Sequence, residues 1–189
     1  MAIRVDSTAI RIKQEGGKFV AEVTPPDGQW RTPHPMSVEE LAVELRNLGC
    51  DRTAAGDAMQ DALLQSYRSM SDEFSPLVTA ALNGEREVPP QEPFVEAWFA
   101  DALFSYDRML YLWEVLESAD AINFEIPNSD RISWAFLRLR KRGWLTIEGS
   151  MYGLSAEGRS SIEAIVAQGN VPDRVYIIER WIKAHPLEG

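Results

Sequence analysis

Few side chains in this sequence have the type and spacing that catalysis or metal binding requires. Asp57 and Asp61 lie four residues apart, so on a helix their carboxylates would share a face and could hold a metal ion or a proton. An exposed acidic face is the simpler interpretation. His34 and His185 each adjoin proline, and neither has a nearby cysteine or second histidine at the spacing of a zinc site. We therefore expect no enzyme, no metal and no cofactor, with a Ser/His/Asp site assembled by the fold as the alternative.

The single cysteine and the overall charge narrow the class of protein. Cys50 cannot form an internal disulfide, which favours a reducing cytoplasm and a small buried side chain. The 189 residues carry a net charge of -10, which argues against a generally basic nucleic-acid coat and against adhesion to anionic membranes. No segment approaches the roughly 18 apolar residues of a membrane span, and the first residues lack the apolar run of a signal peptide. We expect a cytoplasmic protein without a membrane partner.

Basic side chains are nevertheless concentrated in one short segment. Residues 131–145 contain no acidic residue and five basic ones, which are Arg131, Arg138, Arg140, Lys141 and Arg142. These cations could neutralise the phosphates of a nucleic acid. They could equally be solvated side chains that favour the negative end of a helix dipole. The preceding residues 94–130 have the opposite character, with a net charge of -7.

The elements that position these residues begin with a predicted small sheet. Residues 9–13 and 18–23 alternate apolar and polar side chains and flank a turn with two glycines, which predicts a hairpin. Residues 29–32 can form a third strand after a second turn. The first part of the chain therefore reads as a β-meander.

Two helices and a linker are predicted to follow this sheet. Ser37 lies three residues before Glu40, which is the pattern of a capping box, and Gly49 ends that helix. Asp51 is expected to cap a second helix that runs to about Ser69. The three prolines and alternating charges at residues 83–93 predict a linker between a domain at residues 1–82 and one at residues 94–189.

Residues 94–117 are predicted to form one long apolar helix. Seventeen of these 24 residues are apolar, and they cover about half of the helix circumference, more than the ~100° arc of a one-sided helix. Such a helix is either a central core helix or half of a subunit interface. We therefore expect a homodimer, with Leu103, Leu110 and Trp113 at the interface.

Residues 128–168 are predicted to form a helix, a β-hairpin and a second helix. Ser129 or Asp130 starts the first helix, which ends at Gly143. The further elements are a strand at 144–148, a Gly149-Ser150 turn, a strand at 151–154, a helix from Ala156 to about Gln168 capped by Ser155, and an amphipathic helix at 173–182.

The pattern Ile132-Ser133-x-x-Phe136-x-Arg138-Leu139-x-x-Arg142-Gly143-Trp144-Leu145, followed by Tyr152-x-Leu154-Ser155-x-Glu157-Gly158-Arg159, resembles part of a known domain. It is similar to the second half of the winged helix-turn-helix domain of MarR- and PadR-type bacterial regulators, over about 40 of the 189 residues. The resemblance implies a recognition helix at 129–142 and a wing at 144–154. It also implies an α+β fold with a winged-helix-like C-terminal half.

Two functions are compatible with this pattern. The first is a DNA-binding transcriptional regulator, whose contacts would be Arg131, Ser133, Arg138, Arg140, Lys141 and Arg142. The second is a protein-interaction module that uses a winged helix without DNA binding. Trp134 and Leu137 fall on the expected outward face, where they cannot make the paired hydrogen bonds that read base edges. Apolar side chains flanked by cations suit a protein partner instead.

Overall fold

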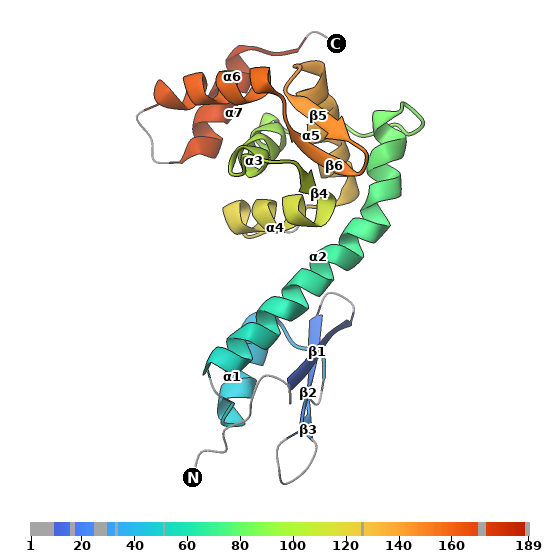
Figure 1. Cartoon of the computed structure of the whole chain (residues 1–189), viewed down its shortest axis with the longest axis vertical. Helices are drawn as coiled ribbons and strands as arrows, with labels where there is room; N and C mark the ends of the chain where they lie inside the picture. The colour runs from blue at the N-terminus through green and yellow to red at the C-terminus, as the bar shows by residue number, and fades with distance from the viewer. Residues whose placement is uncertain are drawn as a thin grey trace. The chain divides into compact units, whose positions relative to one another are not determined.

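The computed structural model describes residues 10–15, 18–24, 30–32, 34–50, 52–125, 127–169 and 173–187. The protein is α+β, with helices and two three-stranded antiparallel sheets in the described part of the chain. It divides into two compact units, Met1–Ser66 and Tyr67–Gly189, and the division lies within the long helix α2 (Arg52–Leu82) (Figure 1). The predicted linker at residues 83–93 therefore follows this division instead of marking it. The second half of α2 belongs with the second unit.

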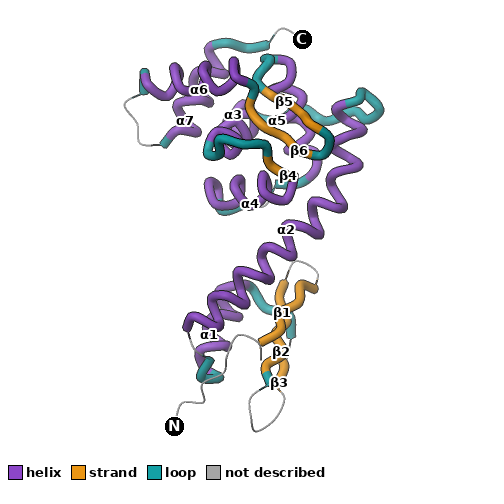
Figure 2. Tube along the Cα trace, in the orientation of Figure 1, coloured by secondary structure: helices purple, strands orange, loops and turns teal. Residues whose placement is uncertain are grey.

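The first unit contains the predicted β-meander. Strands β1 (Ile10–Glu15), β2 (Lys18–Val23) and β3 (Trp30–Arg31) form an antiparallel sheet in that order (Figure 2). Ile10 is opposite Val23 and Glu15 is opposite Lys18, as a hairpin requires. Alternating burial of β2 directs one face of the sheet toward the helices. The two glycines of the predicted hairpin turn lie outside the described residues.

Helix α1 (Val38–Asn47) begins with the predicted capping box. The Ser37 Oγ accepts from the Glu40 N–H at 3.2 Å, and the Glu40 carboxylate accepts from the Ser37 N–H at 2.9 Å. Gly49, at φ +75°, follows the helix end, where a left-handed backbone favours glycine. The core of this unit joins sheet and helices through Ile10, Ile12, Phe19, Ala21, Val23, Met36, Leu41, Leu45, Cys50, Ala54, Ala58 and Ala62.

Helix α2 is longer than the sequence predicts. It continues beyond Ser69 to Leu82, with Pro76 in its interior. Val78 and Ala81 are fully or almost fully buried, so packing supports the later turns although proline removes one helical hydrogen bond. The predicted cap, Asp51, lies outside the described residues.

The second unit is built around a short, completely buried helix. Its elements after α2 are α3 (Pro93–Phe104), β4 (Leu110–Tyr111), α4 (Leu112–Asn123), α5 (Ser129–Lys141), β5 (Leu145–Glu148), β6 (Met151–Leu154), α6 (Ala156–Ala167) and α7 (Arg174–Ala184). The sheet order is β4-β6-β5, all antiparallel. Every residue from Val95 to Leu103 is buried, and α3 packs against α4, α5 and α7 (Figures 1 and 2).

The predicted single helix over residues 94–117 is wrong. The chain leaves the helix at Ser105, forms β4, and starts α4 at Leu112. Two tertiary and local interactions favour the break. Leu110 and Tyr111 pair with β6, and Glu114 accepts a hydrogen bond from the Tyr111 N–H at 2.8 Å, which satisfies one free amide at the start of α4.

The elements of the winged-helix-like pattern lie close to their predicted positions. The cap of α5 is Asn128, one residue before the predicted cap, because its Oδ1 accepts from the Arg131 N–H at 3.0 Å. Ser155 caps α6, as predicted, by accepting from the Gly158 N–H at 2.9 Å. Gly143 and Gly149 have positive φ at the helix end and at the hairpin turn. In the described part of the chain, no helix combines the length and apolar character needed to cross a membrane.

Candidate functional site

Helix α5 carries most of the predicted site residues, and its cations have partners within the chain. Arg131 forms an ion pair with Glu125 through its Nη1, and its guanidinium lies 6.0 Å from the ring centre of Trp98. Ser133 is fully buried and donates its hydroxyl hydrogen to the Ser129 carbonyl at 2.6 Å. Neither the buried hydroxyl nor the paired Arg131 is presented as a free donor.

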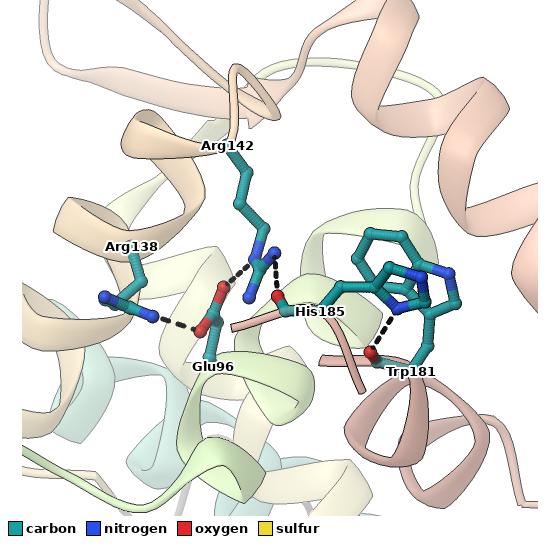
Figure 3. Close-up of polar contacts among 5 residues, drawn as sticks. All are labelled: Glu96, Arg138, Arg142, Trp181 and His185. Atoms are coloured by element: carbon teal, nitrogen blue, oxygen red, sulfur yellow. Dashed lines mark hydrogen bonds and ion pairs between the residues drawn. The ribbon is translucent and has the colours of Figure 1, made fainter. Parts of the chain in front are cut away.

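Glu96 of α3 holds two of the predicted DNA contacts. It is 2% exposed, and Figure 3 shows it between Arg138 and Arg142. The Arg138 Nε lies 3.5 Å from Glu96 Oε2, and the Arg142 Nε donates to Glu96 Oε1. Both guanidinium groups are poorly exposed, at 18% and 6% respectively. Two cations on one buried carboxylate form a charge cluster that ties α5 to α3.

The end of α7 completes the surroundings of Arg142. Arg142 donates from Nη1 to the His185 carbonyl at 3.0 Å, and its guanidinium lies within 5.6 Å of the ring centres of Trp144 and Trp181. His185 stacks on Trp181 with ring centres 4.2 Å apart, and its Nδ1 lies 2.9 Å from the Trp181 carbonyl oxygen (Figure 3). Arg142 is therefore covered by carboxylate, carbonyl and aromatic groups of its own chain.

The remaining two cations of α5 are exposed. Arg140 donates from Nη1 to the Leu82 carbonyl at 2.9 Å, and Lys141 makes no ion pair within the described residues. They border an open groove of about 470 Å³ between the end of α2 and the last turns of α5, lined by Ala81, Leu82, Asn83, Gly84, Leu137, Arg140 and Lys141. This groove is the place on α5 where an exposed cation and an apolar side chain meet.

Trp134 and Leu137, the predicted partner-binding residues, are both half-buried. The guanidinium of Arg138 lies 5.4 Å from the ring centre of Trp134, within the range of a cation–π interaction. Trp134, Leu137 and Lys141 follow one another at intervals of three and four residues, so they lie on one face of α5. The structure thus brings the two predicted residues into line with the exposed Lys141.

A second buried carboxylate lies one and a half turns further along α3. Asp101 is 4% exposed and its Oδ1 lies 2.8 Å from the Nε of Arg174, at the start of α7. Burial raises the pKa of Asp101, and the neighbouring Arg174 opposes this rise. At the other side of the unit, the Tyr67 hydroxyl donates to Asp120 at 2.6 Å, and burial together with this carboxylate raises the pKa of Tyr67.

The three residues predicted for a dimer interface have contacts inside the second unit. Leu103 is 1% exposed and Leu110 is fully buried, so both side chains belong to the core of one chain. Trp113 is half-buried, and the guanidinium of Arg68 lies 5.0 Å from its ring centre. The apolar arc of residues 94–104 is thus covered by helices of the same chain, which matches the first of the two expected roles, a central core helix.

The residues with catalytic potential remain apart. His34, Asp57 and Asp61 are exposed, and Cys50 is buried in the first unit, where burial raises the pKa of its thiol. Within the described ranges, no group of three or more His, Cys, Asp or Glu side chains is arranged to hold a metal ion.

The groups that occupy the predicted DNA contacts were missed from the sequence. Glu125 is a local partner of Arg131, and His185 lies far along the chain from Arg142. One signal for Glu96 is visible: a carboxylate inside a helix that is apolar on every side needs a buried cation. Nothing in the sequence names which cations those are.

No family model, curated protein or solved structure matches this chain.

Proposed function

We propose that the second unit is a winged-helix module that binds a protein and not DNA. The order α3-β4-α4-α5-β5-β6, with a three-stranded sheet in the order β4-β6-β5, supports the winged-helix assignment. In this assignment α5 takes the place of the recognition helix, and the β5–β6 hairpin takes the place of the wing. It agrees with the resemblance of residues 128–168 to MarR- and PadR-type regulators and adds the preceding helices and strand to it.

The observation that carries the proposal is the intramolecular pairing of the α5 cations. A DNA-reading helix keeps its arginines free for phosphates and base edges. Here Arg138 and Arg142 share Glu96, and Arg131 pairs with Glu125. Releasing Arg142 to a phosphate would leave Glu96 buried with one distant cation, which costs free energy. DNA would have to compete with the protein's own structure for these residues.

The hairpin offers no compensating contacts. Residues 145–154 contain no arginine or lysine that could enter a minor groove, and Glu148 is exposed near the tip. Ile147 is also exposed, at 38%. An acidic and apolar wing would repel a phosphate backbone and is compatible with a protein surface.

The face of α5 that remains available has the chemistry of a peptide-binding groove. Leu137 provides an apolar wall, and Arg140 and Lys141 provide positive charge beside it. Trp134 extends this face toward the start of α5. Tryptophan and arginine residues next to apolar pockets are the typical centres of protein interfaces. We infer that the partner presents an apolar side chain flanked by carboxylates.

Salt-dependent binding to a random-sequence DNA duplex tests the first half of the proposal. If only Arg140 and Lys141 reach phosphates, the slope of log K against log salt is no steeper than about -1.8. A regulator that uses four of the predicted cations would give a slope of about -3.6. That steeper slope, flattened by Arg138→Ala, would overturn the proposal.

Acidic peptides with a single leucine or phenylalanine test the second half, with fluorescence anisotropy as the measurement. Lys141→Glu and Leu137→Glu should each weaken binding by about tenfold or more, because one removes the cation and the other places a carboxylate in the groove. Arg180→Glu is the matched control, since Arg180 is exposed on α7 outside the groove. Equal loss in Lys141→Glu and Arg180→Glu would indicate unspecific attraction and contradict the groove.

A further inference from the structure

The first unit contains a cavity that the proposed function does not use. It has a volume of about 620 Å³, which is within the range of about 300–1,000 Å³ typical of small-molecule pockets. It lies between the last turn of α1 and the first turns of α2, and its lining residues are Ala42, Arg46, Cys50, Arg52, Ala55, Gly56 and Met59. All of them belong to the described part of the first unit.

The walls of this cavity are mainly apolar. Ala55 and Met59 lie one turn apart on α2, and Ala42 faces them from α1. Gly56 leaves the space open, because a Cβ atom built there would have no neighbour within 4 Å. Burial raises the pKa of the Cys50 thiol, so this wall group stays protonated and uncharged at neutral pH. An apolar group of a ligand would lose contact with water here without meeting an unpaired charge.

Two arginines supply the polar part of the site. Arg46 comes from the end of α1 and Arg52 from the start of α2. Neither guanidinium forms an ion pair with a residue in the described ranges, in contrast to the arginines of α5. No acidic residue lines the cavity. A pair of free guanidinium groups beside an apolar space is complementary to an anion that carries an apolar tail.

We propose that this cavity binds a free carboxylic acid with an apolar chain. Arg46 and Arg52 hold the carboxylate by charge-assisted hydrogen bonds, and the chain lies against Ala55, Gly56 and Met59. The site is separate from the α5 groove, so the proposal does not depend on a protein partner for the second unit.

Calorimetric titration of the full chain with decanoate tests the site, with decanol and acetate as the two partial ligands. Decanoate should bind, and each partial ligand should bind at least about tenfold more weakly, because decanol lacks the anion and acetate lacks the chain. Binding of decanol as tight as that of decanoate would remove the role assigned to the arginines. No heat with decanoate would overturn the proposal.

Cys50 locates the ligand, because it is the only cysteine of the chain and lines the cavity. At a decanoate concentration about ten times its Kd, alkylation of Cys50 should slow about tenfold, since only the empty site reacts. Calorimetric binding without protection of Cys50 would place the ligand elsewhere and overturn the assignment.

Three variants complete the test. Gly56→Leu fills the cavity from a helical position with open space, so it should abolish decanoate binding while circular dichroism shows an intact fold. Arg46→Gln should weaken binding about tenfold by removing one charged donor. Arg11→Gln, an exposed arginine on β1 that does not line the cavity, is the matched control and should bind like the parent. Equal effects of Arg46→Gln and Arg11→Gln would contradict the site.

Discussion

At the scale of single residues, the buried Glu96 decides what α5 can do. Its two oxygens face Arg138 and Arg142, and those cations have little access to water. A carboxylate placed in this way neutralises the positive end of α5 from inside. The basic segment that dominates the sequence is therefore largely structural in the folded chain.

We expect Glu96→Gln to lower the free energy of unfolding by about 3–5 kcal/mol, because the amide keeps the shape and leaves two poorly exposed arginines without a counter-charge. Chemical denaturation measures this loss. Glu163→Gln, on the exposed side of α6, is the matched control and should stay within about 0.5 kcal/mol of the parent. A Glu96 variant as stable as the control would show that the cluster contributes nothing.

Two carboxylates should give opposite pH dependences of stability. Burial raises the pKa of Asp101 above its ordinary 3.8, so folding favours its protonated form, and its contribution to stability is lost as pH rises through the raised value. The hydrogen bond from Arg108 lowers the pKa of Glu114 below its ordinary 4.5, so its contribution is present at higher pH and is lost as pH falls through the lowered value.

Denaturation as a function of pH checks these signs. As pH falls from neutral, the parent should gain stability relative to Asp101→Asn and lose stability relative to Glu114→Gln. The same direction for both variants would mean that at least one of the two pKa shifts has the opposite sign.

At the scale of elements, close packing and helix propensity oppose each other at Gly158. This residue begins α6 against β5, and a Cβ atom there would lie 2.7 Å from the Cα and the carbonyl oxygen of Trp144. Gly158→Ala should therefore destabilise the protein by about 1–3 kcal/mol, although alanine is the better helix former. Gly56→Ala is the matched control in α2, where the added methyl meets open space and should stabilise by about 0.5–1 kcal/mol. Equal effects in a thermal unfolding experiment would argue against the close contact of α6 with Trp144.

At the scale of the whole molecule, the predicted homodimer stays a prediction, and the structure changes how it is tested. Leu110 is fully buried in one chain, whereas its neighbour Tyr111 is 49% exposed. We expect Leu110→Ala to cost about 2–5 kcal/mol at every protein concentration, because it opens a cavity in the core. Tyr111→Ala should be nearly neutral in a monomer. If Leu110 lay between subunits, its effect would depend on protein concentration, which light scattering and unfolding curves would reveal together.

The sequence by itself determined the features that depend on neighbours along the chain. The capping box at Ser37, the cap at Ser155 and the hairpin after Trp144 follow from hydrogen bonds over two to four residues and from alternation along a strand. The seam of Val175, Ile178 and Ile182 follows from helical spacing, and all three are buried.

Only the tertiary structure decided the break after Phe104 and the availability of the cations on α5. Composition favours a continuous helix over residues 94–117, but pairing of Leu110 and Tyr111 with β6 requires an extended segment there. Likewise, Arg142 is basic in the sequence and occupied in the structure, because Glu96 and His185 reach it from distant parts of the chain. Local patterns specify what a segment can form, whereas strand pairing and charge burial depend on which segments meet.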